Sequence, residues 1–238
     1  MAREMMNLEM AARHVHVDAN ELKHVAQRGE IPAEERHGVW WFDHRDLDEW
    51  AQRNILGFNA KELDAHHEAL EQERAKSHAT RLRVVDYFRT DAVSLELAAK
   101  AKGGLIRDMT DLATASGLVY DDEGLFKELA AREDAAPTAI GMGCAFLHPR
   151  YHDPYFFSES FIAYGRSLRP IFFGAPDGGG TRHFFLICST NHEEHLHLLA
   201  RLAVLAHGTD LLERLDTAED AAGVIAAVEA AETEYLAS

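Results

Sequence analysis

The sequence predicts a mixed α/β (α+β) chain that is built as two units joined by a polar connector. In both units apolar residues recur at the spacing of amphipathic helices. The second unit adds runs of consecutive apolar residues, such as Phe184–Ile187, which are typical of fully buried strands. We therefore expect a small helical unit with a hairpin, followed by a layered sheet with flanking helices.

Composition limits the classes of protein that this chain can represent. Its 238 residues are 47% hydrophobic and include only six prolines, which favours globular folding. The net charge of -16, from 40 acidic and 24 basic residues, argues against a general nucleic-acid binder. Cys144 and Cys188 are too few for a disulfide framework and fit a reducing cytoplasm. No signal-peptide run and no apolar run near ~18 residues is present, so we expect a cytoplasmic protein.

The first unit, residues 1–56, is predicted to run helix, tight turn, helix, hairpin, helix. Asp18 stands three residues before Glu21, as at the start of a capped helix, and Gly29 ends that helix. The segment EIPAEERHGVWWFD predicts two short strands that turn at His37–Gly38, and Asp43 begins a third helix. The apolar faces of the three helices are formed by Leu8, Ala11, Ala12 and Val15, by Leu22, Val25 and Ala26, and by Leu47 and Trp50.

This order of elements is typical of a winged helix-turn-helix. The stretch LEMAARHVHVDANELKHVAQRGEIP…HGVWWFDHRDLDEW resembles the excisionase-like, MerR-related DNA-binding family, which implies that the second helix enters the major groove. The charge is unfavourable, because residues 1–56 hold seven basic and eleven acidic residues. Contact with DNA and contact with a protein therefore both stay open. The candidate DNA-binding residues form one small positive edge: Lys23, His24, Arg28, Arg36 and His37.

The connector, residues 57–80, is predicted to be a solvated linker helix, with His66 and His67 exposed. The second unit, residues 81–238, should begin with two amphipathic helices in SLELAAKAKGGLIRDMTDLATASGLVYDDEGLFKELAARE, the second starting after Asp121–Asp122. Strands are predicted up to His148, in SESFIAYGRS and in RHFFLICST. A helix ending near Gly208 and a last helix starting at Thr217 should complete the layers.

The motif around His148 resembles a known phosphorylation site. Residues 141–148 read Gly-Met-Gly-Cys-Ala-Phe-Leu-His, similar to the Gly-X-Gly-X-Ala-X-Pro-His of the fructose/mannitol-class enzyme IIA domains of the bacterial phosphotransferase system. The nitrogen-regulatory (PtsN) branch is the most similar. The resemblance covers residues 82–235, including Arg132, FGAPDGG, HFFLIC and EHLHLLARL. Leu147 replaces the family's proline, and Pro149 replaces its glycine.

A phosphoryl acceptor needs an unprotonated nitrogen near neutral pH, and imidazole provides one because its reference pKa is about 6.5. One ring nitrogen of His148 would attack, and the other should donate to a fixed acceptor. Arg132 and Arg150 can bind the negatively charged phosphoryl group. The N–H groups of Gly141 and Gly143 can approach an oxyanion closely. The resemblance adds His195 as the second histidine, with His197 turned away. We expect the ring of His148 to be open to solvent.

The motifs of the sequence indicate where the phosphate would come from. There is no nucleotide-binding loop and no dinucleotide fingerprint, so no cofactor is predicted. The resemblance implies that an HPr-like phosphocarrier is the partner and that the chain is a phosphoryl-carrying transferase component. Phosphorylation would then alter binding to a regulated target or to DNA. The alternative is a helix-turn-helix regulator whose IIA-like unit is no longer phosphorylated, favoured by Leu147 and Pro149.

A metal site is the rival interpretation of the histidines in HEEHLH. The zinc-protease motif needs two histidines four residues apart, whereas His192 and His195 are three apart. No third ligand is indicated, so no metal is predicted. Cys144, in a small apolar strand, is expected to be an inert packing residue.

Overall fold

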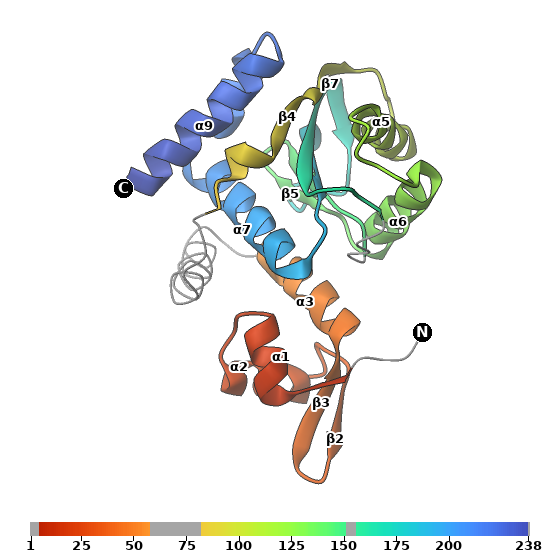
Figure 1. Cartoon of the computed structure of the whole chain (residues 1–238), viewed down its shortest axis with the longest axis vertical. Coiled ribbons are helices and arrows are strands. Elements are labelled where there is room, and N and C mark those ends of the chain that lie inside the picture. Colours follow the sequence, from red (N-terminus) through yellow and green to blue (C-terminus); the bar gives the residue numbers. More distant parts are fainter. Residues whose placement is uncertain (1–4, 58–81, 151–155, 238) are drawn as a thin grey trace.

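The computed structural model describes residues 5–57, 82–150 and 156–237. Figure 1 shows a small N-terminal unit joined through one long helix to a larger unit with a central sheet. The predicted connector helix over residues 57–80, with His66 and His67, lies outside the described residues apart from Gly57. No helix in the described ranges has both the length and the apolar character needed to span a bilayer.

The N-terminal unit has the predicted order of elements and one extra strand. It consists of β1 (Met5–Asn7), α1 (Leu8–His14), α2 (Ala19–Gln27), β2 (Ala33–Arg36), β3 (Val39–Asp43) and α3 (His44–Gly57). The short strand β1 was not predicted, and it pairs with β3 in a sheet of order β1-β3-β2.

The ends of these elements follow from their local chemistry. The Asp18 carboxylate accepts from the N–H groups of Asn20 and Glu21, as a helix N-cap should. The hairpin turns through His37 and Gly38, both with positive φ, as a two-residue hairpin loop of the primed type requires. These predictions of the sequence are confirmed.

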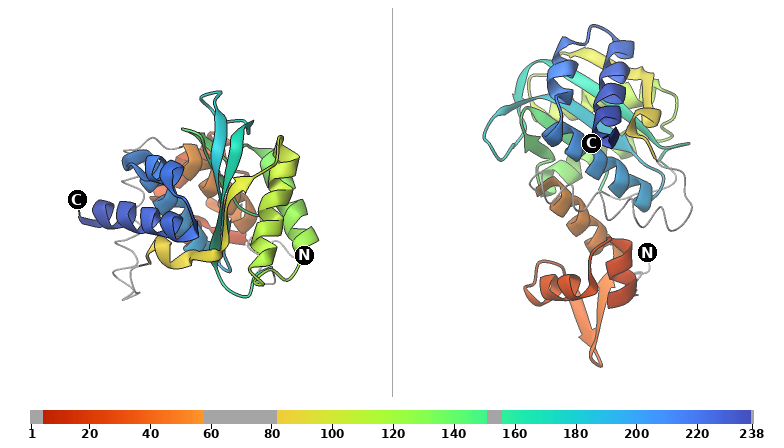
Figure 2. Two further views of the ribbon diagram at one scale, coloured as in Figure 1. Left: turned by 90° about the horizontal axis from the view of Figure 1, so that it is seen from above. Right: turned by 90° about the vertical axis from the view of Figure 1, so that its left-hand side faces the viewer.

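The larger unit has a five-stranded mixed sheet of order β4-β7-β8-β6-β5. Helices cover both faces: Figure 2 shows α7, α8 and α9 on one side and α5 and α6 on the other. Its elements are η1 (Val84–Tyr87), β4 (Phe88–Leu97), α5 (Lys102–Ala115), α6 (Asp122–Ala135), β5 (Ala139–Gly141), β6 (Cys144–Leu147), β7 (Phe161–Phe172), β8 (Gly180–Cys188), α7 (His192–Gly208), α8 (Leu211–Thr217) and α9 (Ala221–Ala237).

Burial on both faces explains the continuous apolar runs of the central strands. Along β8, Phe185 and Ile187 pack into the cluster under α7 and α9, whereas Phe184 and Leu186 pack into the cluster under α5 and α6. Successive side chains of a strand point to opposite faces, so a strand covered on both sides must be apolar throughout.

Two predicted boundaries are wrong. Ser94–Leu97, predicted as the start of a helix, are the end of β4, which pairs in parallel with β7. Their spacing suits a helix, but pairing with a neighbouring strand overrides that preference. Thr217 ends α8 instead of starting the last helix, which begins at Ala221, where the Asp220 carboxylate accepts from the Gly223 N–H.

His183 provides a prediction for stability against pH. Its ring is 3% exposed and lies 2.8 Å from the Tyr164 hydroxyl, and burial lowers the pKa of His183 to about 4. The unfolded chain binds this proton near pH 6.5, so stability that is present above pH 6.5 is lost as the pH falls toward 4. We expect urea unfolding to show a loss of about 2–3 kcal/mol from this group between pH 7 and pH 4.5. His183→Gln should flatten this slope, and an unchanged slope would contradict the assignment.

Candidate functional site

The topology of the sheet brings His148 and His195 together. His148 follows the last residue of β6, and β6 runs parallel to β8. The carboxyl ends of parallel strands meet at one edge, and the chain leaves β8 at this edge to begin α7. His195 lies in the first turns of α7, and its ring centroid is 5.0 Å from that of His148, edge to face.

Hydrogen bonds define the tautomer of His148. Its Nδ1 lies 2.9 Å from the carbonyl oxygen of Phe146, which can only accept, so Nδ1 carries the proton. Nε2 lies 3.0 Å from Nε of Arg132, which can only donate. The network therefore assigns the lone pair to Nε2. The predicted fixed acceptor is a backbone carbonyl, and no sequence signal distinguishes it from any other.

Arg132 is held at the end of α6 with one donor group still unused. Its Nη1 donates to the carbonyl oxygen of Ala136 at 2.8 Å, and Nε faces His148. Within the described residues, its buried Nη2 has no hydrogen-bond partner. Burial lowers the pKa of Arg132, yet a guanidinium stays charged near neutral pH. An unpaired charged donor beside the lone pair of Nε2 is suited to an anionic ligand.

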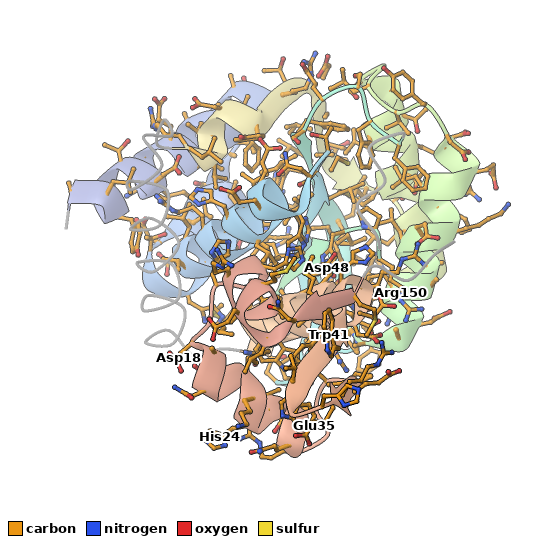
Figure 3. The ribbon with its side chains drawn as sticks, turned by 60° about the horizontal axis from the view of Figure 1, so that its bottom comes forward. Asp18, His24, Glu35, Trp41, Asp48 and Arg150 are labelled. Carbon is orange, nitrogen blue, oxygen red and sulfur yellow. The ribbon has the colours of Figure 1, made fainter. Side chains whose placement is uncertain are left out.

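One expectation about His148 is wrong, because its ring is 0% exposed. The helix α3 lies against this edge of the larger unit, packed on α7 and near β5 (Figure 1). Figure 3 shows Asp48 of α3 and Arg150 close to each other, where the N-terminal unit meets the larger unit. No local pattern in the sequence of either unit indicates this contact.

Polar contacts hold α3 in this position. Arg150, two residues after His148, donates through Nη2 to Glu49 at 2.8 Å. Asp48 lies 2.6 Å from Nε2 of His14 and 3.2 Å from Nδ1 of His192. Arg150, predicted as a phosphate ligand, is thus paired with a carboxylate of the N-terminal unit.

The structure does not bring Gly141 and Gly143 to His148. They form the turn before β6, whereas His148 follows its other end, so the length of the strand separates Gly143 from His148 by about 16 Å. The N–H of Met142, between the two glycines, donates to Asp177 at 2.9 Å. The positive φ of all three residues serves this turn and not a phosphate site.

Residues 86–231 match the family model "Phosphoenolpyruvate-dependent sugar phosphotransferase system, EIIA 2". The chain belongs to this family. The match leaves residues 1–85 outside it.

Individual relatives agree. The chain is 30% identical over 131 residues to the "PTS system fructose-specific EIIA component" of Haloferax volcanii, covering 54% of this chain and 83% of that protein. It is 27% identical over 144 residues to a "Nitrogen regulatory protein" of Bradyrhizobium diazoefficiens, covering 59% and 91%. Among solved structures, nitrogen regulatory protein IIA-Ntr from Neisseria meningitidis matches with a TM-score of 0.54 and 26% identity, covering 61% and 98%. IIA mannitol from Escherichia coli shares the fold, with a TM-score of 0.51 and 20% identity, covering 59% and 97%.

The other histidines of the IIA domain are separated in space. His197 points away from the site, as expected, and its Nε2 lies 3.3 Å from the carbonyl oxygen of Leu82.

In the described ranges, the one group of residues that could hold a metal is His14, Asp48 and His192, with ligand atoms within 4.8 Å of one another. Asp48 hydrogen-bonds His14, its Oδ1 lies 3.2 Å from Nδ1 of His192, and the two imidazole rings stack, so packing among these three side chains accounts for the group.

The predicted DNA-binding edge is largely neutralised. Arg28 donates to Glu30 at 2.5 Å, and Arg36 donates through Nε to Glu34 at 2.9 Å. Both pairs are exposed, and Lys23 and His24 lie nearby on α2. Paired arginines release few counterions on binding DNA, which weakens the electrostatic part of affinity.

The tautomer of His148 provides a prediction that needs no partner protein. Nitrogen-15 NMR of the imidazole rings should show His148 neutral, with the proton on Nδ1, near pH 7. Arg132→Gln should keep this tautomer, because the Phe146 carbonyl is unchanged. A ring with its proton on Nε2 would contradict the hydrogen-bond network described above.

Proposed function

We propose that this protein is a cytoplasmic regulator whose His148 accepts a phosphoryl group on Nε2 from the phosphohistidine of an HPr-like phosphocarrier. The observation that supports this most is the arrangement around Nε2. Its lone pair faces Arg132, the opposite ring nitrogen is fixed by the Phe146 carbonyl, and Arg132 has an unused donor. Membership of the IIA family supports the same chemistry.

The transfer needs only positioning and charge stabilisation. The lone pair of His148 Nε2 forms the new P–N bond, while the carrier's P–N bond breaks and its electron pair returns to the carrier's ring nitrogen. Charge is spread over the three equatorial oxygens of the phosphoryl group during transfer. Arg132 must then turn from Nε2 to these oxygens, where its fork of donors can bind two of them.

The residues that flank His148 do not obstruct this role. Leu147 is 2% exposed and packs in the apolar cluster under α5 and α6, on the other face of the sheet from Phe146. Pro149 is buried as well. Neither replacement disturbs the hydrogen bonds of His148, which favours a working acceptor over a degenerate domain.

A phosphotransfer assay tests the proposal. The full chain, incubated with phosphoenolpyruvate, enzyme I and a phosphocarrier, should take up one phosphoryl group, and His148→Ala should take up none. Arg132→Met should lower the rate about 100-fold, because one stabilising donor group is lost at the developing charge. Arg132→Lys should recover part of it, since the charge remains but the fork does not.

The matched control for this assay is Arg169→Met, which removes an exposed arginine of β7. It should react like the wild type. Circular dichroism should show that the Arg132 variants are folded. Wild-type protein without label under conditions where a known IIA is labelled would reject phosphorylation and leave the alternative of an unphosphorylated regulator.

We also propose that residues 1–56 form the excisionase-like unit through which phosphorylation alters binding to a target. For DNA as that target, the ion pairs of Arg28 and Arg36 predict weak, shallow salt dependence. Three to four phosphate contacts would lower affinity roughly 40- to 150-fold between 50 and 200 mM salt. In a gel shift we expect the DNA affinity of the wild type to fall less than about tenfold over this range of salt. The double variant Glu30→Gln, Glu34→Gln should steepen the response, and a steep wild-type response would contradict this expectation.

A further inference from the structure

The cover over His148 is part of the same chain. We propose that helix α3 and the phosphocarrier are mutually exclusive occupants of the face that carries His148, so that phosphorylation of His148 releases the N-terminal unit. The release of the N-terminal unit by phosphorylation rests on the proposed function. The burial of His148 under α3 does not depend on that function. The partner that fits this face at rest is therefore the acidic face of α3, with Asp48 and Glu49.

Access to Nε2 requires that α3 move. His148 and His195 are 0% exposed and Arg132 is 1% exposed while α3 is docked. The last turn of α3 and Arg132 line one groove, so the helix lies directly beside the guanidinium. A phosphocarrier must bring phosphorus within bonding distance of Nε2, in line with the bond that breaks. No second protein can do so through a buried ring.

Charge makes the phosphorylated state incompatible with docking. A phosphoryl group brings about two negative charges and three strong acceptor oxygens to the face that α3 covers with Asp48 and Glu49. Arg150 donates to Glu49 in the docked state, and a phosphoryl group two residues away is a stronger acceptor for the same guanidinium. Phosphorylation would therefore remove the main ion pair of Glu49 and replace it with repulsion.

Buried polar atoms in the docked state favour undocking of α3. Gln52, one turn after Asp48 on α3, is 0% exposed, and within the described part of the chain neither of its amide atoms has a hydrogen-bond partner. Unsatisfied buried polar atoms oppose burial, and both Gln52 and Nη2 of Arg132 gain water when α3 leaves. Against this, Ile55 of α3 belongs to the apolar cluster that continues into α7, which keeps the unit docked at rest.

Thermodynamic linkage predicts how docking of α3 and the reaction with the phosphocarrier affect each other. If docking of α3 weakens binding of the phosphocarrier, then the bound phosphocarrier weakens docking by the same factor. The apparent rate of phosphorylation falls with the fraction of open molecules, so a variant that opens the chain must react faster. A structural role for α3 alone would predict no such gain.

The first test measures access to His148 without any phosphocarrier. Diethyl pyrocarbonate modifies accessible neutral imidazoles, and peptide mass spectrometry can follow the peptide with His148 in the full chain. Glu49→Lys places a second positive charge beside Arg150, which should undock α3. We expect the carbethoxylation rate of His148 to rise at least fivefold. The control Glu35→Lys makes the same charge change on β2, at the exposed end of the N-terminal unit far from Asp48 and Arg150 (Figure 3), and should leave it unchanged.

The second test measures the separation of the two units. Cys144 and Cys188 are both 0% exposed, and burial raises the pKa of each thiol, so they should resist labelling. Spin labels on Glu35→Cys and Tyr120→Cys, both exposed, report the distance between the units. Phosphorylation should lengthen and broaden the distance distribution, and the same mixture with His148→Ala should not.

The outcomes separate this inference from the proposed function. Equal carbethoxylation rates at His148 in wild type, Glu49→Lys and Glu35→Lys would overturn the cover, even if phosphotransfer succeeds. Complete phosphorylation with an unchanged label distance would overturn the release. A cover confirmed by Glu49→Lys, with no phosphoryl transfer to the wild type or to Glu49→Lys, would instead reject the proposed function and phosphorylation as the trigger.

Discussion

The hydrogen bond from Arg132 to Nε2 of His148 is the constraint on which the site depends. A cationic donor can face this nitrogen only while the nitrogen keeps its lone pair, so the contact selects a neutral ring with its proton on Nδ1. The Phe146 carbonyl holds that proton, and the Ala136 carbonyl holds the guanidinium. The acceptor nitrogen and its charge partner are therefore prepared together, before any phosphate arrives.

The fold supplies these contacts through the mixed sheet. β6 and β8 are parallel, so His148 and the start of α7 meet at one edge, while the short hairpin of β5 and β6 brings the end of α6 to the same edge. Burial of the sheet on both faces fixes the strands that carry these residues. The Gly141–Gly143 turn contributes at the opposite end, where it closes the hairpin through Asp177.

Local signals predicted what depends on local chemistry. The caps Asp18 and Asp121, the buried run of β8 and the extent of α7 were readable because each depends on neighbouring residues. The end of β4 has the spacing of a helix, and only its pairing with β7 makes it a strand. The burial of His148 has no local sequence signal, because the residues that join the two units, such as Glu49 and Arg150, are 101 positions apart.

The acidity of α3 gives one physical account of both units. In the docked state the Glu49 carboxylate binds Arg150, two residues after the acceptor histidine, so an anion of the chain already holds one of the arginines that a phosphoryl group could bind. Because the two anions compete for the same cation, the N-terminal unit can respond to phosphorylation through side-chain movements of Arg132 and Arg150 alone. The same acidic surplus weakens its contact with DNA, so the feature that makes α3 a good cover makes this unit a poor groove binder. Docking accounts in this way for the carboxylates of Asp48 and Glu49, which meet His192 and Arg150 of the IIA domain.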